Sequence, residues 1–278
     1  MYTIIVCLHV YKLRRRITDA YSHTIWDGAR YTVAAFFDAQ SRIWHDYQVF
    51  GLENIPDTGA ALIVTYHGAL ALDMYYLISR IMMTKRRMVY SVVDRFLYKC
   101  GLRAFLDLTC CIAGTREKAV EVLKGGNLLC VAPGGVREAL FSGPSYEIMW
   151  NKRSGFARVA MEANVPILPM FTKNIREVVR TFTPIGKGLL RKMYEKTRLP
   201  LVPLYGGLPV KLETYIGKPI ISQCGETAEA LALRVKEGVQ ALIDQYQIIP
   251  GSIPRALKER WISNHHHFNN NSNSLDVQ

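Results

Sequence analysis

His67 and Asp73 lie six positions apart in the stretch YHGALALDMYYL, and the five residues between them are small or aliphatic. An aspartate that accepts a hydrogen bond from imidazole Nδ1–H fixes the histidine tautomer and leaves Nε2 free to accept a proton. An apolar connector keeps water away and strengthens the interaction between the two groups. The spacing therefore predicts a general base. The alternative is a histidine at a strand end and an aspartate that only caps a helix.

A second candidate for chemistry is the stretch VAPGGVREAL, residues 131–140. Gly134 and Gly135 let the backbone approach a ligand closely, because glycine has no Cβ. Arg137 and Glu138 follow at the start of a predicted helix, where free N–H groups and a guanidinium favour an anion. The alternative is an ordinary strand-to-helix turn.

Apolar strands alternate with helices around these two stretches. This pattern predicts an α/β fold with a mostly parallel central sheet flanked by helices. Both stretches follow a predicted strand, at the sheet edge where such folds bind ligands. The predicted strands are residues 60–66, 88–93, 127–132 and 165–171, with a strand pair joined at 217–218, and the predicted helices are residues 74–83, 117–123, 155–163 and 227–246.

The beginning of the chain suggests contact with a membrane. Residues 1–11 are apolar and a KLRRR cluster follows, which is typical of the cytosolic end of a membrane span and not of a signal peptide. Because a span takes about 20 residues, we expect residues 1–16 to be a truncated anchor; the alternative is a short buried or frayed helix. Residues 17–47 have the pattern of a long amphipathic helix that either packs on the core or lies in a membrane interface.

Composition narrows the kind of partner. The 278 residues are 49% hydrophobic and carry a net charge of +12, which suits one large domain, placed at residues 17–260, and an anionic partner. The sequence lacks zinc-finger spacings and RNP-type aromatic motifs, so nucleic acid is not expected. Residues 184–207 mix basic, aromatic and aliphatic side chains, which indicates either a solvated helix or a contact with anionic lipid headgroups.

Other potential sites in the sequence have simpler explanations. The six cysteines form no CxxC pair, which indicates reduced thiols facing the cytosol. The HHH run at residues 265–267 belongs to a polar segment, residues 261–278, so we expect a disordered tail and no metal site. The absence of a G-x-S-x-G elbow argues against a serine hydrolase.

The order of the motifs resembles the glycerolipid acyltransferases of the PlsC type. That family has a histidine–aspartate box, a Gly–Phe block, an EGTR-like block after a later strand, and a final V-P-I-x-P block. Longer stretches such as WDGARYTVA and YGGLPVKLETYIGKPI are closer still to the subgroup of transmembrane protein 68 and the plant phytyl ester synthases. The resemblance covers about residues 12–260, and its four blocks here are residues 67–73, 101–107, 133–138 and 165–169.

The resemblance implies transfer of an acyl group from acyl-CoA, as co-substrate, to a hydroxyl of mono- or diacylglycerol. The site would face the cytosol at the endoplasmic reticulum membrane and would need no metal or bound cofactor. His67 would take the hydroxyl proton and Asp73 would stabilise the imidazolium. Gly134 and Gly135 would hold the oxyanion, Arg137 would bind an acceptor or CoA oxygen, and Phe105 would line an acyl channel. Glu138 would be a further substrate contact.

The chain departs from the family pattern in ways that bear on the substrate. The family box has four residues between histidine and aspartate, where this chain has five. Glycine replaces the EGTR glutamate, which favours a neutral acylglycerol. AGTRE at residues 113–117 also resembles an EGTR block, but we set it aside because we expect no strand before it. Alternative functions are a lysophospholipid or glycerol-phosphate acyltransferase, a non-catalytic lipid-binding protein on the same fold, and a soluble anion-binding protein.

Overall fold

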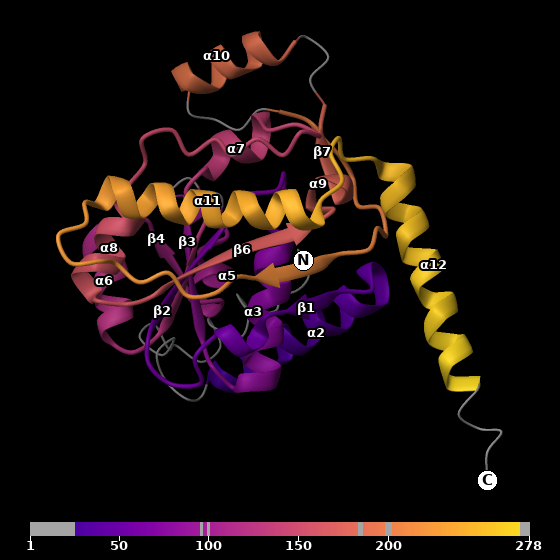
Figure 1. Cartoon of the computed structure of the whole chain (residues 1–278), viewed down its shortest axis with the longest axis horizontal. Coiled ribbons are helices and arrows are strands. Elements are labelled where there is room, and N and C mark those ends of the chain that lie inside the picture. Colours follow the sequence, from indigo (N-terminus) through magenta and orange to yellow (C-terminus); the bar gives the residue numbers. More distant parts are fainter. Residues whose placement is uncertain (1–25, 95–96, 99–100, 183–185, 198–201, 273–278) are drawn as a thin grey trace.

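The computed structural model of the chain describes residues 26–94, 97–98, 101–182, 186–197 and 202–272 (Figure 1). The predicted anchor remnant, residues 1–16, and the start of the predicted long helix lie outside these residues. The rest of that helix is α2, Asp27–His45, which ends where Asp46 adopts a left-handed conformation (φ 45°). Within the described ranges, every helix is too short or too polar to cross a membrane.

A seven-stranded sheet forms the centre of the fold, and the predicted fold class is confirmed. The strands from β6 to β4 in the spatial order run parallel, and β9 pairs with β6 in the antiparallel direction. The carboxyl ends of the parallel strands therefore meet at one edge. In spatial order the strands are β1 (Gln48–Phe50), β9 (Glu213–Ile216), β6 (Ile167–Lys173), β2 (Ala61–Thr65), β5 (Leu128–Val131), β3 (Val89–Val93) and β4 (Cys111–Ala113).

Helices cover both faces of the sheet (Figure 1). Strand β2 shows why: Leu62 and Val64 belong to one apolar cluster and Ala61 and Ile63 to another, because successive side chains point to opposite faces. Burial on both faces explains the unbroken apolar run ALIVT. One face carries α6 (Arg116–Lys124), α8 (Gly155–Ala163) and α11 (Ala228–Tyr246), and the other carries α3 (Leu72–Lys85), against which α2 packs.

Shorter elements surround the carboxyl edge of the sheet. The strands β7 (Val179–Thr181) and β8 (Leu204–Gly206) form an antiparallel pair outside the main sheet. The helix α10 between them stands apart from the body in Figure 1, and its Leu190 and Tyr194 pack on α7. The bounds of the remaining helices are η3 (Leu52–Asn54), α5 (Arg103–Leu108), α7 (Gly135–Phe141), α9 (Ile175–Val178), α10 (Lys187–Thr197) and α12 (Ile253–Ser272).

Three features of the structure differ from the local predictions. After β9 the chain makes one isolated bridge, between Ile167 and Ile220, instead of a second strand, since Pro219 has no N–H for a ladder. AGTRE does follow a strand, β4, so the expectation that no strand precedes it was wrong. The helix α12 continues to Ser272, through residues where a loose tail was predicted.

Candidate active site

The carboxyl ends of β2, β3, β4 and β5 border a cavity of about 750 Å³. Most of its wall is aliphatic or aromatic, with side chains from α2, α3, α5 and α7. His67 and Asp94 bring an imidazole and a carboxylate to this wall, and two further residues expected at the site, Phe105 and Gly135, also line it. An apolar cavity with few polar groups suits a hydrocarbon ligand that is held by one reactive end.

The ring of His67 has a defined tautomer. Its Nδ1 lies 2.6 Å from the carbonyl oxygen of Gly68. A carbonyl oxygen only accepts, so Nδ1 carries the proton and Nε2 presents its lone pair. Burial lowers the pKa of His67, the bond to Gly68 opposes this, and the positive charge of Arg176 lowers the pKa further. The neutral ring that a general base requires is therefore favoured.

The structure does not pair Asp73 with His67. Asp73 lies in the first turn of α3 and is 2% exposed, and its Oδ2 has no hydrogen-bond partner. Burial raises the pKa of Asp73 to about 7, against the backbone N–H groups of Met74 and Asp73 and the hydroxyl of Thr172, which lower it. The predicted hydrogen bond to the imidazole is replaced by that from Nδ1 to Gly68, so a carbonyl within the five-residue connector orients the ring.

Glu138 does not line the cavity. Its carboxylate is fully buried and accepts hydrogen bonds from the N–H of His67 (2.8 Å) and of Met149 (2.7 Å). Burial raises its pKa to about 7. A Cβ on Gly134 would lie 2.3 Å from the Glu138 Cδ, so this glycine makes room for the carboxylate. The structure thus gives Glu138 and Gly134 a supporting position instead of the predicted contact with substrate.

The two arginines in EGTR-like stretches point away from the cavity. Arg137 binds Glu195 of α10 at 2.5 Å and is not among the residues that line the cavity, so the predicted role on a substrate oxygen stays a prediction. Arg116 of AGTRE binds Glu162 at the surface, at 2.6 Å. Gly114 of the same stretch nevertheless lines the cavity, because β4 ends there.

Arg176 contacts the backbone of His67 and was not predicted from the sequence. It follows β6 in the stretch FTKNIRE and is 3% exposed. Its guanidinium lies 3.3 Å from the carbonyl oxygen of His67 and 2.5 Å from that of Glu138. An arginine three positions after an apolar strand was the available signal, but contacts with residues 109 positions away leave no pattern in the sequence.

Comparison with known proteins agrees with this architecture. Residues 46–173 match the family model described as Acyltransferase. A Bos taurus protein named "DGAT1/2-independent enzyme synthesizing storage lipids" is 51% identical over 94% of this chain and 78% of its own length. The Homo sapiens protein of that name is 50% identical over 94% of this chain and 80% of its own length.

More distant proteins share the same domain. "Phytyl ester synthase 2, chloroplastic" of Arabidopsis thaliana is 26% identical over 74% of this chain and 35% of its own length. The crystal structure of the 1-acyl-sn-glycerophosphate acyltransferase PlsC from Thermotoga maritima aligns with a TM-score of 0.59. That alignment covers 87% of this chain and 90% of the other at 20% identity, which shows a shared fold.

The sheet, the cavity at its carboxyl edge and the histidine box define an acyltransferase domain of the PlsC type. Given the identity to the bovine and human proteins, the chain belongs to the acyltransferase family, in its group of transmembrane protein 68 and the phytyl ester synthases.

The raised pKa of Asp73 predicts a dependence of stability on pH. A carboxyl with a higher pKa in the folded state contributes stability that is complete below its unfolded value of 3.8 and is lost as the pH rises through about 7. The loss is about 1.4 kcal/mol for each unit by which the two pKa values differ. We expect Asp73→Asn to remove this part of the decline between about pH 4 and about pH 7, as measured by urea unfolding.

Asp244→Asn, at an exposed position of α11, is the matched control and should keep the wild-type pH dependence. If the unfolding free energy of Asp73→Asn fell with pH as steeply as that of the wild type, the Asp73 carboxyl would be ionised in the folded protein throughout this range.

Proposed function

We propose that this protein transfers a fatty acyl group from acyl-CoA to the hydroxyl of a mono- or diacylglycerol, with His67 as general base. The observation that carries the proposal is the His67 ring, held in its base tautomer at the wall of an apolar cavity. The names of the bovine and human relatives refer to storage lipids, and that of the Arabidopsis relative to a phytyl ester. These names support ester formation on an apolar acceptor.

The charges around the cavity favour a neutral acceptor over a phosphorylated one. A phosphate group is normally held by arginine or lysine. Among the described residues, the cavity lining includes neither arginine nor lysine. Arg137, which was predicted to hold an acceptor or CoA oxygen, binds Glu195 instead.

The proposed reaction uses one proton carrier. The acceptor hydroxyl gives its proton to Nε2 of His67 while its oxygen attacks the thioester carbonyl carbon. The tetrahedral intermediate then collapses, the C–S bond breaks, and the imidazolium returns the proton to the CoA thiolate. The Gly68 carbonyl keeps the ring oriented through both steps, because it accepts the Nδ1–H bond in the neutral and the charged state.

We further propose that α2 lies on a membrane, at the cytosolic face of the endoplasmic reticulum as the family resemblance implies. A typical surface helix buries its apolar side and exposes its polar side, whereas α2 buries several polar residues and exposes apolar ones. Its buried side carries Arg30, Asp38, Ser41 and His45. Its exposed side carries Phe36 (51% exposed), Ile43 (73%) and Trp44 (46%). Phe36 and Ile43 lie seven positions apart and Trp44 is next to Ile43, so the three share one side of the helix, which favours the interface of a bilayer.

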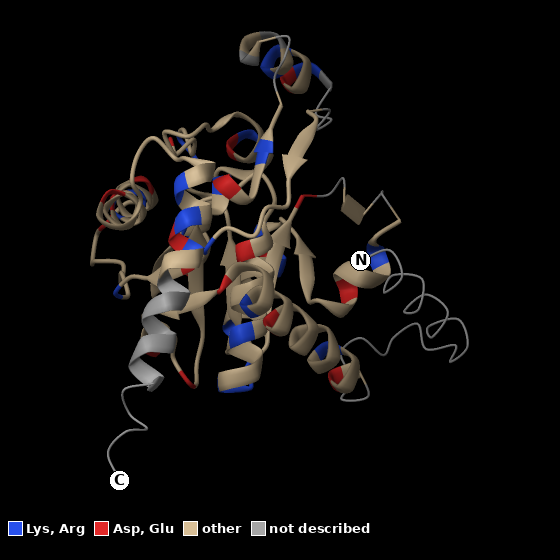
Figure 2. Cartoon of the chain, turned by 90° about the vertical axis from the view of Figure 1, so that its right-hand side faces the viewer, with Lys and Arg blue, Asp and Glu red and all other residues tan. Residues whose placement is uncertain are grey.

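Other surfaces extend this apolar side. The Nε1–H of Trp44 donates to Gly207, directly after β8, where Leu204 is exposed and also lines the cavity. The helix α10 beside this hairpin has exposed Arg191, Lys192 and Lys196 and appears as the basic helix at the top of Figure 2. Basic residues near anionic headgroups contribute about 1 kcal/mol each. A lipid acceptor could then enter the cavity from the bilayer.

His67→Ala tests the proposed base. We expect kcat to fall by about 10²- to 10⁴-fold, the usual contribution of a general base, with little change in Tm. The matched control is His45→Ala, because the His45 Nδ1 also bonds to a backbone carbonyl, that of Val210 at 2.9 Å, away from the cavity. The control should lose stability and keep its turnover per folded molecule. Purified protein with labelled acyl-CoA and a panel of acylglycerol and lysophospholipid acceptors measures both.

The same assay separates two roles for Asp73. A hydrogen-bonded dyad predicts that Asp73→Asn loses as much activity as His67→Ala, and orientation by Gly68 predicts a much smaller loss. Activity of His67→Ala within a few-fold of wild type would contradict the proposed base.

Vesicle binding tests the proposed membrane surface. We expect Phe36→Glu combined with Ile43→Glu to weaken binding at least tenfold, because burying each side chain contributes about 1.5–3 kcal/mol. Leu233→Glu is the matched control: Leu233 is 56% exposed on α11, which covers the opposite face of the sheet. Binding should also strengthen with anionic lipid and weaken with salt, since screening limits electrostatic reach to about 10 Å at 0.1 M. Equal losses in the two variants would contradict the assignment of the α2 face.

A further inference from the structure

Arg176 is a buried cation whose hydrogen bonds all go to neutral oxygen atoms. Its Nε donates to the hydroxyl of Tyr66, and its Nη2 lies 2.5 Å from the Glu138 carbonyl oxygen and 3.3 Å from that of His67. Both terminal nitrogens lie 3.4 Å from the carbonyl oxygen of Ala139. A buried charge is costly unless it is well satisfied. These contacts surround the residue before His67, His67 itself and the end of α7.

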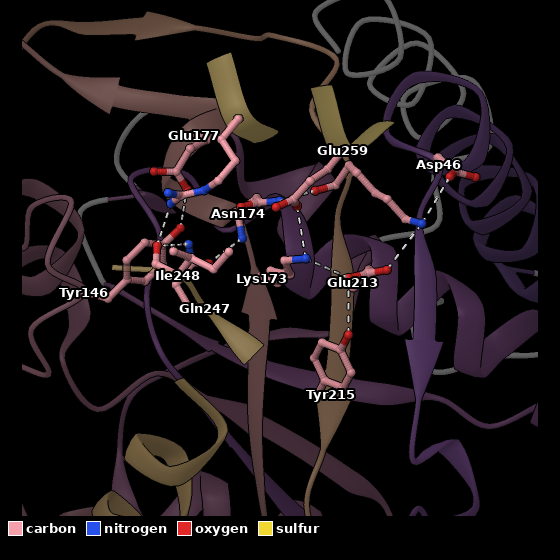
Figure 3. A network of polar contacts seen from close by, with 12 residues as sticks. Asp46, Tyr146, Lys173, Asn174, Glu177, Glu213, Tyr215, Gln247, Ile248 and Glu259 are labelled. Atoms are coloured by element: carbon pink, nitrogen blue, oxygen red, sulfur yellow. Dashed lines mark hydrogen bonds and ion pairs between the residues drawn. The ribbon is translucent and has the colours of Figure 1, made fainter. Parts of the chain in front are cut away.

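The rest of the fold holds Arg176 firmly in place. Asn174, with φ 62°, begins the short helix α9, and its side chain donates to Lys211 O at 3.1 Å and to a Glu259 oxygen at 2.9 Å. Its backbone N–H donates to Gln247 at 2.9 Å. Glu177, the residue after Arg176, accepts from the Tyr146 hydroxyl. Figure 3 shows Asn174 and Glu177 among these partners, which come from α12 (Glu259), from just after α11 (Gln247) and from the loop that holds Tyr146.

Arg176 and Glu138 hold the backbone on the two sides of His67. The His67 N–H donates to the Glu138 carboxylate at 2.8 Å, and the His67 carbonyl accepts from Arg176. Arg176 also holds the carbonyl of Glu138, so the three residues form a closed set of contacts. The next carbonyl along the chain, that of Gly68, accepts from the ring. The direction of the imidazole thus depends on a backbone segment that Arg176 fixes from behind.

We propose that Arg176 is a positioning residue for acyl transfer, which holds the His67 backbone against the end of α7 so that the ring faces the cavity. This inference rests on the proposed function. Arg176 does not line the cavity and is not expected to touch substrate. The competing explanation is purely structural: a guanidinium also stabilises the last carbonyls of a helix such as α7.

The charge of Arg176 acts on the pKa of His67, and a loss of fold stability alone would not change that pKa. The titratable groups near the ring are Glu138 from α7 and Arg176 from α9, with Asp94 also at the cavity wall and Asp73 in α3. The positive charge of Arg176 disfavours the imidazolium and so lowers the pKa of His67. Its removal should raise this pKa, and the acid limb of the kcat/KM profile should then move to higher pH.

Two variants of Arg176 and one control test the proposal. Arg176→Gln should lower kcat about tenfold or more, leave KM for both substrates nearly unchanged, and move the acid limb to higher pH. Arg176→Lys keeps the charge but loses the fork of donors, so kcat should fall while the acid limb stays near its wild-type position. The control is Arg180→Gln, whose guanidinium binds Glu177 and Gly251 O away from His67. It should lose stability without moving the acid limb.

Each result decides the matter. With an active wild-type protein, an unmoved acid limb in Arg176→Gln, or activity losses that only follow the unfolded fraction as in Arg180→Gln, would overturn the positioning role. Failure of both Arg176 variants to fold would make the residue structural and overturn it as well. Absence of transfer by the wild-type protein, across the acceptor panel, is a distinct result that would remove the proposed function and this inference with it.

Discussion

The hydrogen bond from the His67 N–H to the buried Glu138 carboxylate joins the segment after β2 to α7, which follows β5, and the geometry of the site depends on it. A fully buried carboxylate is tolerable only when its oxygens are occupied. The N–H of Met149 occupies the second oxygen. The turn before α7 requires glycine at position 134, because a side chain on Gly134 would occupy the space of the Glu138 carboxylate.

His67 therefore separates two different environments. In front of it lies an apolar cavity of about 750 Å³ that suits acyl chains. Behind it lies a layer of buried polar groups, in which Tyr66, Ser142 and Arg176 bond to one another and to the backbone. Hydrogen bonds from the polar layer fix the backbone of His67, while its ring faces a substrate that can form few hydrogen bonds itself. It suits chemistry on a lipid, because the positioning forces need not come from the substrate.

Local patterns in the sequence predicted most of the fold but only part of the site. The alternation of strands and helices, and the Thr227 cap of α11, depend on neighbouring residues and were confirmed. The presence of Phe105 and Gly135 at the cavity followed from motif order and from the edge where parallel strands end. The three-residue strand β4 was missed because it is too short to show a periodic pattern.

Side-chain partners were harder to predict because they depend on distant contacts. The connector after His67 satisfies the imidazole by its own Gly68 carbonyl, so the spacing to Asp73 did not give the expected pair. Arg137 turns to α10, and Glu138 turns inward to the backbone of His67. Arg176 reaches the site from α9, which follows β6, the strand next to β2. None of these directions is encoded in a spacing along the chain.

The central claim is that His67 is a neutral base whose Nδ1–H is held by Gly68. Nitrogen NMR of the full chain, labelled at its seven histidines and assigned with His67→Gln, tests it most directly. At pH 7 the account predicts a neutral His67 ring protonated at Nδ1, with a pKa below the ordinary value of 6.5. A ring protonated at Nε2, or an imidazolium at that pH, would contradict it.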